Sequence, residues 1–120
     1  MKLTSQHFDL FKAECEKQLD RLGLKSWKVY YQFKQLKDSF GNAQWNYAGR
    51  VATITLANDF PKPFDNLESQ IKETALHECL EILLAPISDI ASSRGYSPVD
   101  CDKEIHSVIR TLEKLLKEGK

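Results

Sequence analysis

Residues 74–84 read Thr-Ala-Leu-His-Glu-Cys-Leu-Glu-Ile-Leu-Leu and predict the second half of a helix over residues 66–84. The leucines of this stretch share one face of the helix and predict a side that is buried in the core: Leu76, Leu80, Leu83 and Leu84. His77 and Glu81 are four residues apart, so at about 100° per residue their side chains leave the same flank of the helix. A histidine nitrogen and a carboxylate oxygen placed in this way can hold one divalent metal ion.

Further candidate site residues lie beside this pair and in the last helix. Glu78 is outside the ligand pair, where it can reach a metal-bound water, as in the H-E-x-x-H zinc helix. Catalytic zinc usually has a third protein ligand and an open position for water. His106 and Glu104 in the C-terminal segment are the candidates for that ligand, and both are better placed than His7 near the N-terminus.

The order of elements predicts an α+β fold in a single domain over residues 1–120. Apolar side chains at helical spacing predict a first helix over residues 5–22, with Gly23 at its end. Aromatic and β-branched residues between 26 and 56 predict three strands, most simply arranged as an antiparallel sheet.

The ends of the two later helices are also predicted from local sequence. Asp65 and Glu68 form a D-x-x-E pattern that indicates a capping box, and Pro86 is expected to stop the helix. Residues 87–97 are expected to form a loop or a short helix. Ser97 and Pro98 are typical of a helix start, and they precede an apolar stripe that consists of Ile105, Val108, Ile109, Leu112, Leu115 and Leu116.

Composition narrows the function classes. The 17 lysines and arginines equal the 17 aspartates and glutamates in number, and this zero net charge argues against a nucleic-acid binder. No apolar run approaches the roughly 20 residues that cross a bilayer, and the N-terminal segment does not resemble a secretory signal. Cys15, Cys79 and Cys101 are odd in number and form no CxxC pair, so we expect reduced thiols in a cytoplasmic protein.

Two segments resemble the small phage and prophage zincin-like metallopeptidases of a minimal gluzincin type. They read TALHECLEILLAPI at 74–87 and EIHSVIRTLEKLL at 104–116. The order of strands before the zinc helix is similar too, so the resemblance spans nearly the whole chain, although only the helix motifs are specific. In that family the helix usually reads H-E-x-x-H and a glutamate on the following helix is the third ligand. Here Glu81 and His106 stand in those two places, as if histidine and glutamate had been exchanged; a slip of two residues would make Glu104 the ligand.

The resemblance implies a metal-dependent peptidase. Zn²⁺ would be held by His77, Glu81 and His106, and Glu78 would be the general base that takes a proton from the attacking water. The partner would be a peptide or protein substrate, paired with the strand at 51–56, in the cytoplasm of a bacterial host. Candidates for an oxyanion stabiliser are Tyr96 and Arg110.

Other interpretations stay open. H-E-x-x-E is a short pattern that also occurs in ordinary helices with charged residues at the rim of an apolar face. His106 could be a surface histidine beside Glu113, and Cys79 lies about 160° around the helix from Glu81, where core packing is expected. The chain could therefore be an inactive zincin-like protein that acts as a binding or structural module, or an interaction protein without a metal.

Overall fold

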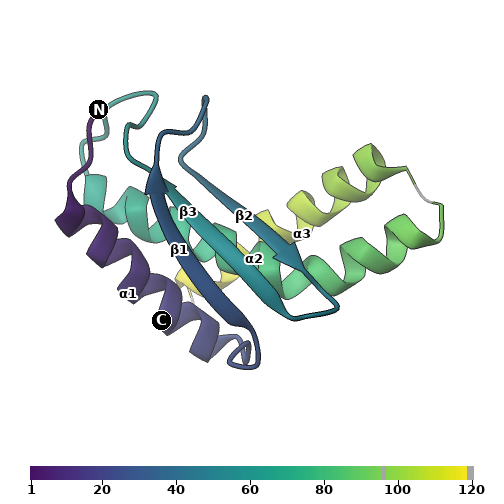
Figure 1. Ribbon diagram of the computed structural model, residues 1–120. Coiled ribbons are helices and arrows are strands. Elements are labelled where there is room, and N and C mark those ends of the chain that lie inside the picture. The colour runs from purple at the N-terminus through teal and green to yellow at the C-terminus, as the bar shows by residue number, and fades with distance from the viewer. Residues whose placement is uncertain (96, 119–120) are drawn as a thin grey trace.

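The computed structural model describes residues 1–95 and 97–118 and has an α+β fold (Figure 1). Within this range the chain forms three helices and one three-stranded sheet. In chain order the elements are α1 (Ser5–Arg21), β1 (Lys28–Lys34), β2 (Gly41–Asn46), β3 (Val51–Ala57), α2 (Leu67–Ser93) and α3 (Pro98–Glu118). No helix of the described residues has the length and hydrophobicity needed to span a membrane.

The first helix forms as predicted and uses His7 for its own cap. The Thr4 side chain accepts a hydrogen bond from the backbone N–H of His7, and the His7 ring nitrogen Nδ1 accepts one from the backbone N–H of Thr4 at 2.9 Å. This reciprocal pair satisfies two N–H groups that the helix start leaves free. Gly23 follows with a φ of 74°, a left-handed conformation that glycine adopts without strain.

The sheet is mixed, so the predicted antiparallel arrangement is wrong. The strand order is β1-β3-β2, with β1 parallel and β2 antiparallel to β3. β2 and β3 are joined by a short turn and must run in opposite directions, but β3 then inserts between β1 and β2. β3 is the most deeply buried strand, with residues 54–57 all buried, and the centre of the sheet is where such a strand is covered best.

The central place of β3 also corrects the predicted substrate-binding strand. A strand with hydrogen-bonded neighbours on both sides has no free edge for an extended peptide. Among the described residues, the free edges of the sheet belong to β1 and β2.

One face of the sheet carries the core. Inward residues of the three strands are in register, as in the row formed by Tyr31, Ile54 and Ala43. They pack on α1 and α2, which cover the same face (Figure 1). Buried members of this core include Phe11, Cys15, Ile54, Leu56, Ile71, Ala75, Cys79 and Ile82.

α2 does not end at Pro86 but continues to Ser93, contrary to the sequence-based expectation. Proline lacks the N–H that would bond to the carbonyl four residues earlier, which costs about 3 kcal/mol inside a helix. Tertiary contacts offset this cost. Ala85 is fully buried, and the Trp45 indole nitrogen on β2 lies 3.4 Å from a carboxylate oxygen of Asp89 beyond the proline. The extension and α3 thereby form a long helical hairpin (Figure 1).

The caps of the two later helices differ in how well they were predicted. Asn66, rather than Asp65, caps α2, because its side-chain oxygen accepts a hydrogen bond from the Ser69 N–H at 3.1 Å. The start of α3 is confirmed: the Ser97 hydroxyl accepts from the Asp100 N–H at 3.4 Å, and Pro98 is the first helical residue.

A second apolar cluster joins α3 to α2. Ile109 is fully buried against Leu76 and Leu80, with partly buried residues around it: Leu22, Leu83, Leu84, Ile105, Leu112 and Leu116. This seam fixes which face of α3 is turned toward α2.

Replacement of Ile109 by a smaller residue should therefore weaken the packing of α3 on α2. We expect Ile109→Ala to lower the free energy of unfolding by about 2–4 kcal/mol, the usual cost of emptying a buried isoleucine site. The neighbouring Val108 is 47% exposed, and Val108→Ala should change the free energy by less than about 1 kcal/mol. Urea unfolding followed by circular dichroism measures both, and equal effects of the two substitutions would contradict the packing described.

Candidate metal centre

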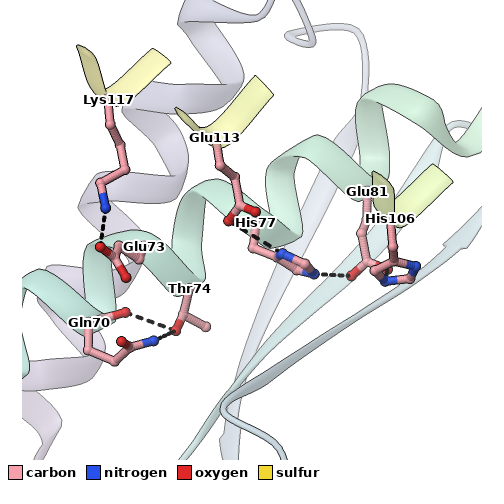
Figure 2. A network of polar contacts seen from close by, with 8 residues as sticks. All are labelled: Gln70, Glu73, Thr74, His77, Glu81, His106, Glu113 and Lys117. Carbon is pink, nitrogen blue, oxygen red and sulfur yellow. Dashed lines mark hydrogen bonds and ion pairs between the residues drawn. The ribbon is translucent and has the colours of Figure 1, made fainter. Parts of the chain in front are cut away.

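Two helices bring the three predicted ligands together. α2 carries His77 and Glu81, α3 carries His106, and their ligand atoms all lie within 4.8 Å of one another (Figure 2). All three side chains are partly exposed, so an ion from solution can reach them. Two histidines and one glutamate are enough, in number and in chemical type, to bind a metal ion.

The two imidazole rings approach the same carboxylate from different helices. His77 Nε2 lies 3.9 Å from Glu81 Oε2, and His106 Nε2 lies 3.7 Å from Glu81 Oε1. These separations exceed ordinary hydrogen-bond lengths. Two ligands on one tetrahedral zinc ion are about 3.3 Å apart when each bond is about 2.0–2.1 Å. The donor set therefore fits a single metal ion after a small inward movement of the side chains.

The opposite nitrogen of each ring faces an acceptor. His77 Nδ1 lies 3.4 Å from Glu113 Oε2, and His106 Nδ1 lies 2.9 Å from the backbone oxygen of Asp102. A carbonyl oxygen can only accept, so the contact with Asp102 requires a proton on His106 Nδ1, and in the neutral ring the lone pair is then on Nε2. Histidines that ligate metals typically have such an outer partner, which fixes the ring orientation and the tautomer.

The sequence did not identify Glu113 as a partner of His77. It placed Glu113 beside His106, seven residues away on the same helix face, whereas the structure turns the Glu113 carboxylate toward His77 across the helix interface (Figure 2). The spacing contained only part of the signal, because two helical turns keep His106 and Glu113 on the same face of α3. What it lacked was the register between α2 and α3, which the Ile109 seam sets.

Glu78 is buried next to this cluster. Its side chain is 4% exposed, and its Oε1 has no hydrogen-bond partner among the described residues. The start of β2 covers it: a Cβ on Gly41 would lie 3.1 Å from Glu78 Oε2 and 2.8 Å from the Thr74 methyl carbon. Glycine at this position thus lets β2 approach α2. An orphaned buried carboxyl oxygen costs free energy, and such groups in native proteins call for a functional explanation.

Burial raises the pKa of the Glu78 carboxyl to about 10, and the neighbouring Glu81 carboxylate raises it further. At neutral pH the group is therefore protonated in the metal-free protein. A divalent cation bound at the adjacent cluster would act in the opposite direction, because positive charge favours the carboxylate.

A cleft of about 360 Å³ opens beside His77 and Glu78. Its walls come from the turn before β2, from α2 between Gln70 and Glu78, and from Glu113 on α3. Of the three residues in the cluster, His77 lines this cleft, and Glu81 and His106 do not.

The other residues considered from sequence lie elsewhere. Glu104 is exposed and lines a separate groove with Ile87 and Cys101, so it does not join the cluster. Arg110 is exposed on α3 and does not line the cleft. Tyr96 lies outside the described residues. Cys79 is fully buried in the core, as expected, with its Sγ 3.6 Å from the backbone oxygen of Cys15.

Comparison of the chain with protein-family models, with curated proteins and with solved structures finds no match in any of the three. The resemblance to zincin-like peptidases therefore stays a prediction from the helix motifs.

The protonation of Glu78 predicts a pH dependence of stability in the metal-free protein. The folded pKa of about 10 exceeds the ordinary value of 4.5, so the folded state holds this proton more tightly than the unfolded state. The contribution of this proton to the free energy of unfolding is full below about pH 4.5 and is lost as the pH rises toward 10. Between pH 6 and 8 the free energy of unfolding of the wild-type protein should fall relative to that of Glu78→Gln, with a slope of at most about 1.4 kcal/mol per pH unit.

Urea unfolding with a chelator present measures this difference. Glu68→Gln changes an exposed glutamate in the first turn of the same helix and is the control, because its curve should run parallel to that of the wild type. Parallel curves for Glu78→Gln as well would show that Glu78 is ionised in the folded protein.

Proposed function

We propose that the chain is a metal-dependent peptidase in which His77, Glu81 and His106 hold Zn²⁺ and Glu78 is the general base. One observation carries the proposal. Two Nε2 atoms from different helices converge on one carboxylate, and each ring has its Nδ1 against an acceptor. A chance group of surface charges has no reason to orient both rings in this way.

The donor set supports zinc in particular. Two imidazole nitrogens and one carboxylate oxygen match a common ligand set of catalytic zinc, which leaves a fourth position open. When bound, the ion would polarise a scissile carbonyl and lower the pKa of a coordinated water. Glu113 and the backbone of Asp102 would hold the two imidazole rings in place for this task.

Glu78 is the group that would move the proton. It is adjacent in sequence to the ligand His77 and lines the same cleft, and its Oε1 is available to accept a hydrogen bond. In its ionised form it would take a proton from the attacking water and then donate it to the leaving amine. The raised pKa of this carboxyl supports the first step, because the carboxylate form is then a stronger base toward the attacking water.

β2, rather than the strand at 51–56, is the strand that could bind an extended substrate. It is an edge strand, its first residue Gly41 lines the cleft, and its outer backbone groups have no strand partner among the described residues. A peptide paired with this edge would extend its chain past His77 and Glu78.

The alternative is an inactive zincin-like protein that acts as a binding module. The deep burial of Glu78 favours it, because a general base must reach both water and substrate. Phage or prophage origin and a cytoplasmic location also stay predictions of the sequence resemblance.

Zinc affinity tests the ligand set. We expect one zinc ion per chain in protein purified without a tag or chelator, measured by elemental mass spectrometry. His77→Ala and His106→Ala should each weaken zinc binding by more than about 100-fold in a chelator competition, and Glu113→Gln by about 10-fold, as for an outer partner. His7→Ala and Glu104→Ala are the controls and should keep full affinity. Loss of zinc in Glu104→Ala with retention in His106→Ala would overturn the proposed ligand set.

Glu78→Gln separates an enzyme from a binding module. The variant should bind zinc as the wild type does, while kcat/KM on a peptide library falls by about 100-fold or more, because general base catalysis contributes that much. Cleavage is followed by mass spectrometry of the products. Equal cleavage by both proteins would exclude Glu78 as the base, and no cleavage by zinc-loaded wild type would favour the inactive module.

A further inference from the structure

We propose that the cleft beside the metal centre is a subsite that selects a lysine or arginine side chain of the substrate. This inference rests on the proposed peptidase function, because the cleft shares His77 and Glu78 with the candidate metal centre. It adds a substrate class to that function: peptides with a basic residue next to the scissile bond.

The first observation is the charge of the cleft walls. Acidic side chains reach them from three separate segments: Asp38 from the turn before β2, Glu73 from α2 and Glu113 from α3. No lysine or arginine of the described residues lines the cleft. Converging carboxylates without a cation favour a cationic ligand and repel an acidic one.

The three carboxylates are not equally available. Glu113 is turned toward His77, and Glu73 forms an ion pair with Lys117 (Figure 2). Asp38 has no ion-pair partner among the described residues, and it is exposed. Its backbone has a φ of 56°, a left-handed conformation that aspartate tolerates in turns. Asp38 is therefore the carboxylate that is best placed to meet an incoming charge.

The second observation is the orphaned oxygen of Glu78. This side chain is more than nine-tenths buried and lines the cleft, and its Oε1 has no hydrogen-bond partner among the described residues. A buried polar atom without a partner destabilises the fold, and a polar occupant of the cleft would remove that cost. The cleft is thus built to receive a hydrogen-bonding ligand, which an acidic surface patch alone would not show.

The remaining walls suit a long side chain with a polar end. Phe40 lines the cleft and is fixed by Phe60 and Phe64, whose ring centroids lie 4.9 and 5.3 Å from its own. An aromatic wall accommodates the methylene stem of lysine or arginine and attracts the cationic head. Gln70 adds an amide to the same wall.

The test compares two peptides that differ in one charge. Acetyl-Ala-Ala-Ala-Arg-Ala-Ala-Ala-amide is matched with the same peptide carrying citrulline, which is a neutral analogue of arginine. Binding to the full zinc-loaded chain is followed by amide shifts in NMR titrations, and cleavage is followed by mass spectrometry of the same samples. We expect the arginine peptide to bind at least 10-fold more tightly, and to be cleaved faster by a similar factor.

Two variants locate the selectivity. Asp38→Asn removes the charge and keeps a residue that adopts left-handed turns, so the fold should be retained; it should reduce the arginine-to-citrulline ratio at least threefold. Glu16→Gln makes the same charge change at an exposed position on α1, away from the cleft, and should leave the ratio unchanged.

The outcomes separate this inference from the peptidase proposal. Cleavage of both peptides at equal rates would overturn the cationic subsite and leave the peptidase standing. Selective binding of the arginine peptide that is lost in Asp38→Asn, with no cleavage, would support the subsite and contradict the peptidase. Equal or undetectable binding of both peptides would overturn the subsite, whether or not the protein binds zinc.

Discussion

The packing of α3 on α2 is the constraint on which the candidate site depends. Ile109 is buried against Leu76 and Leu80 at the centre of an apolar seam, and this seam sets both the rotation and the register of α3. His106 lies one turn before Ile109 and Glu113 one turn after it, so the seam brings both polar residues over α2. A shift of α3 by one residue would turn them away from His77 and Glu81. The polar cluster is therefore a consequence of hydrophobic packing rather than its cause.

Glu78 is where the fold and the proposed chemistry make opposing demands. β2 covers it closely because Gly41 has no side chain, and burial favours the protonated carboxyl. A general base must instead be ionised when it meets water. A dication held three residues away by Glu81 would supply the charge that makes ionisation favourable. In the proposed function the carboxyl would be neutral without the metal and would become a base with it, while Glu78 itself lines the cleft where substrate and water would enter.

Local sequence predicted the three helices and the three residues that cluster, because helical periodicity places His77 and Glu81 on one flank of α2, and His106 was the histidine singled out on the following helix. It failed where distant packing decides. Alternating residues in β1, β2 and β3 show which face is buried but not the strand order, so the mixed sheet was missed. Pro86 predicted a helix end, but burial of Ala85 and the contact of Trp45 with Asp89 carry α2 onward. The pairing of Glu113 with His77 crosses two helices, and no pattern within one helix could reveal it.

A crystal structure of the protein with zinc, with anomalous diffraction recorded at the zinc edge, tests the central claim most directly. The account predicts one strong anomalous peak between the Nε2 atoms of His77 and His106 and the Glu81 carboxylate, about 2.0–2.1 Å from each ligand atom. It also predicts that Glu113 stays against His77 Nδ1. An anomalous peak that lies elsewhere, or none at this cluster in a protein that is folded as described, would contradict the assignment of a metal centre.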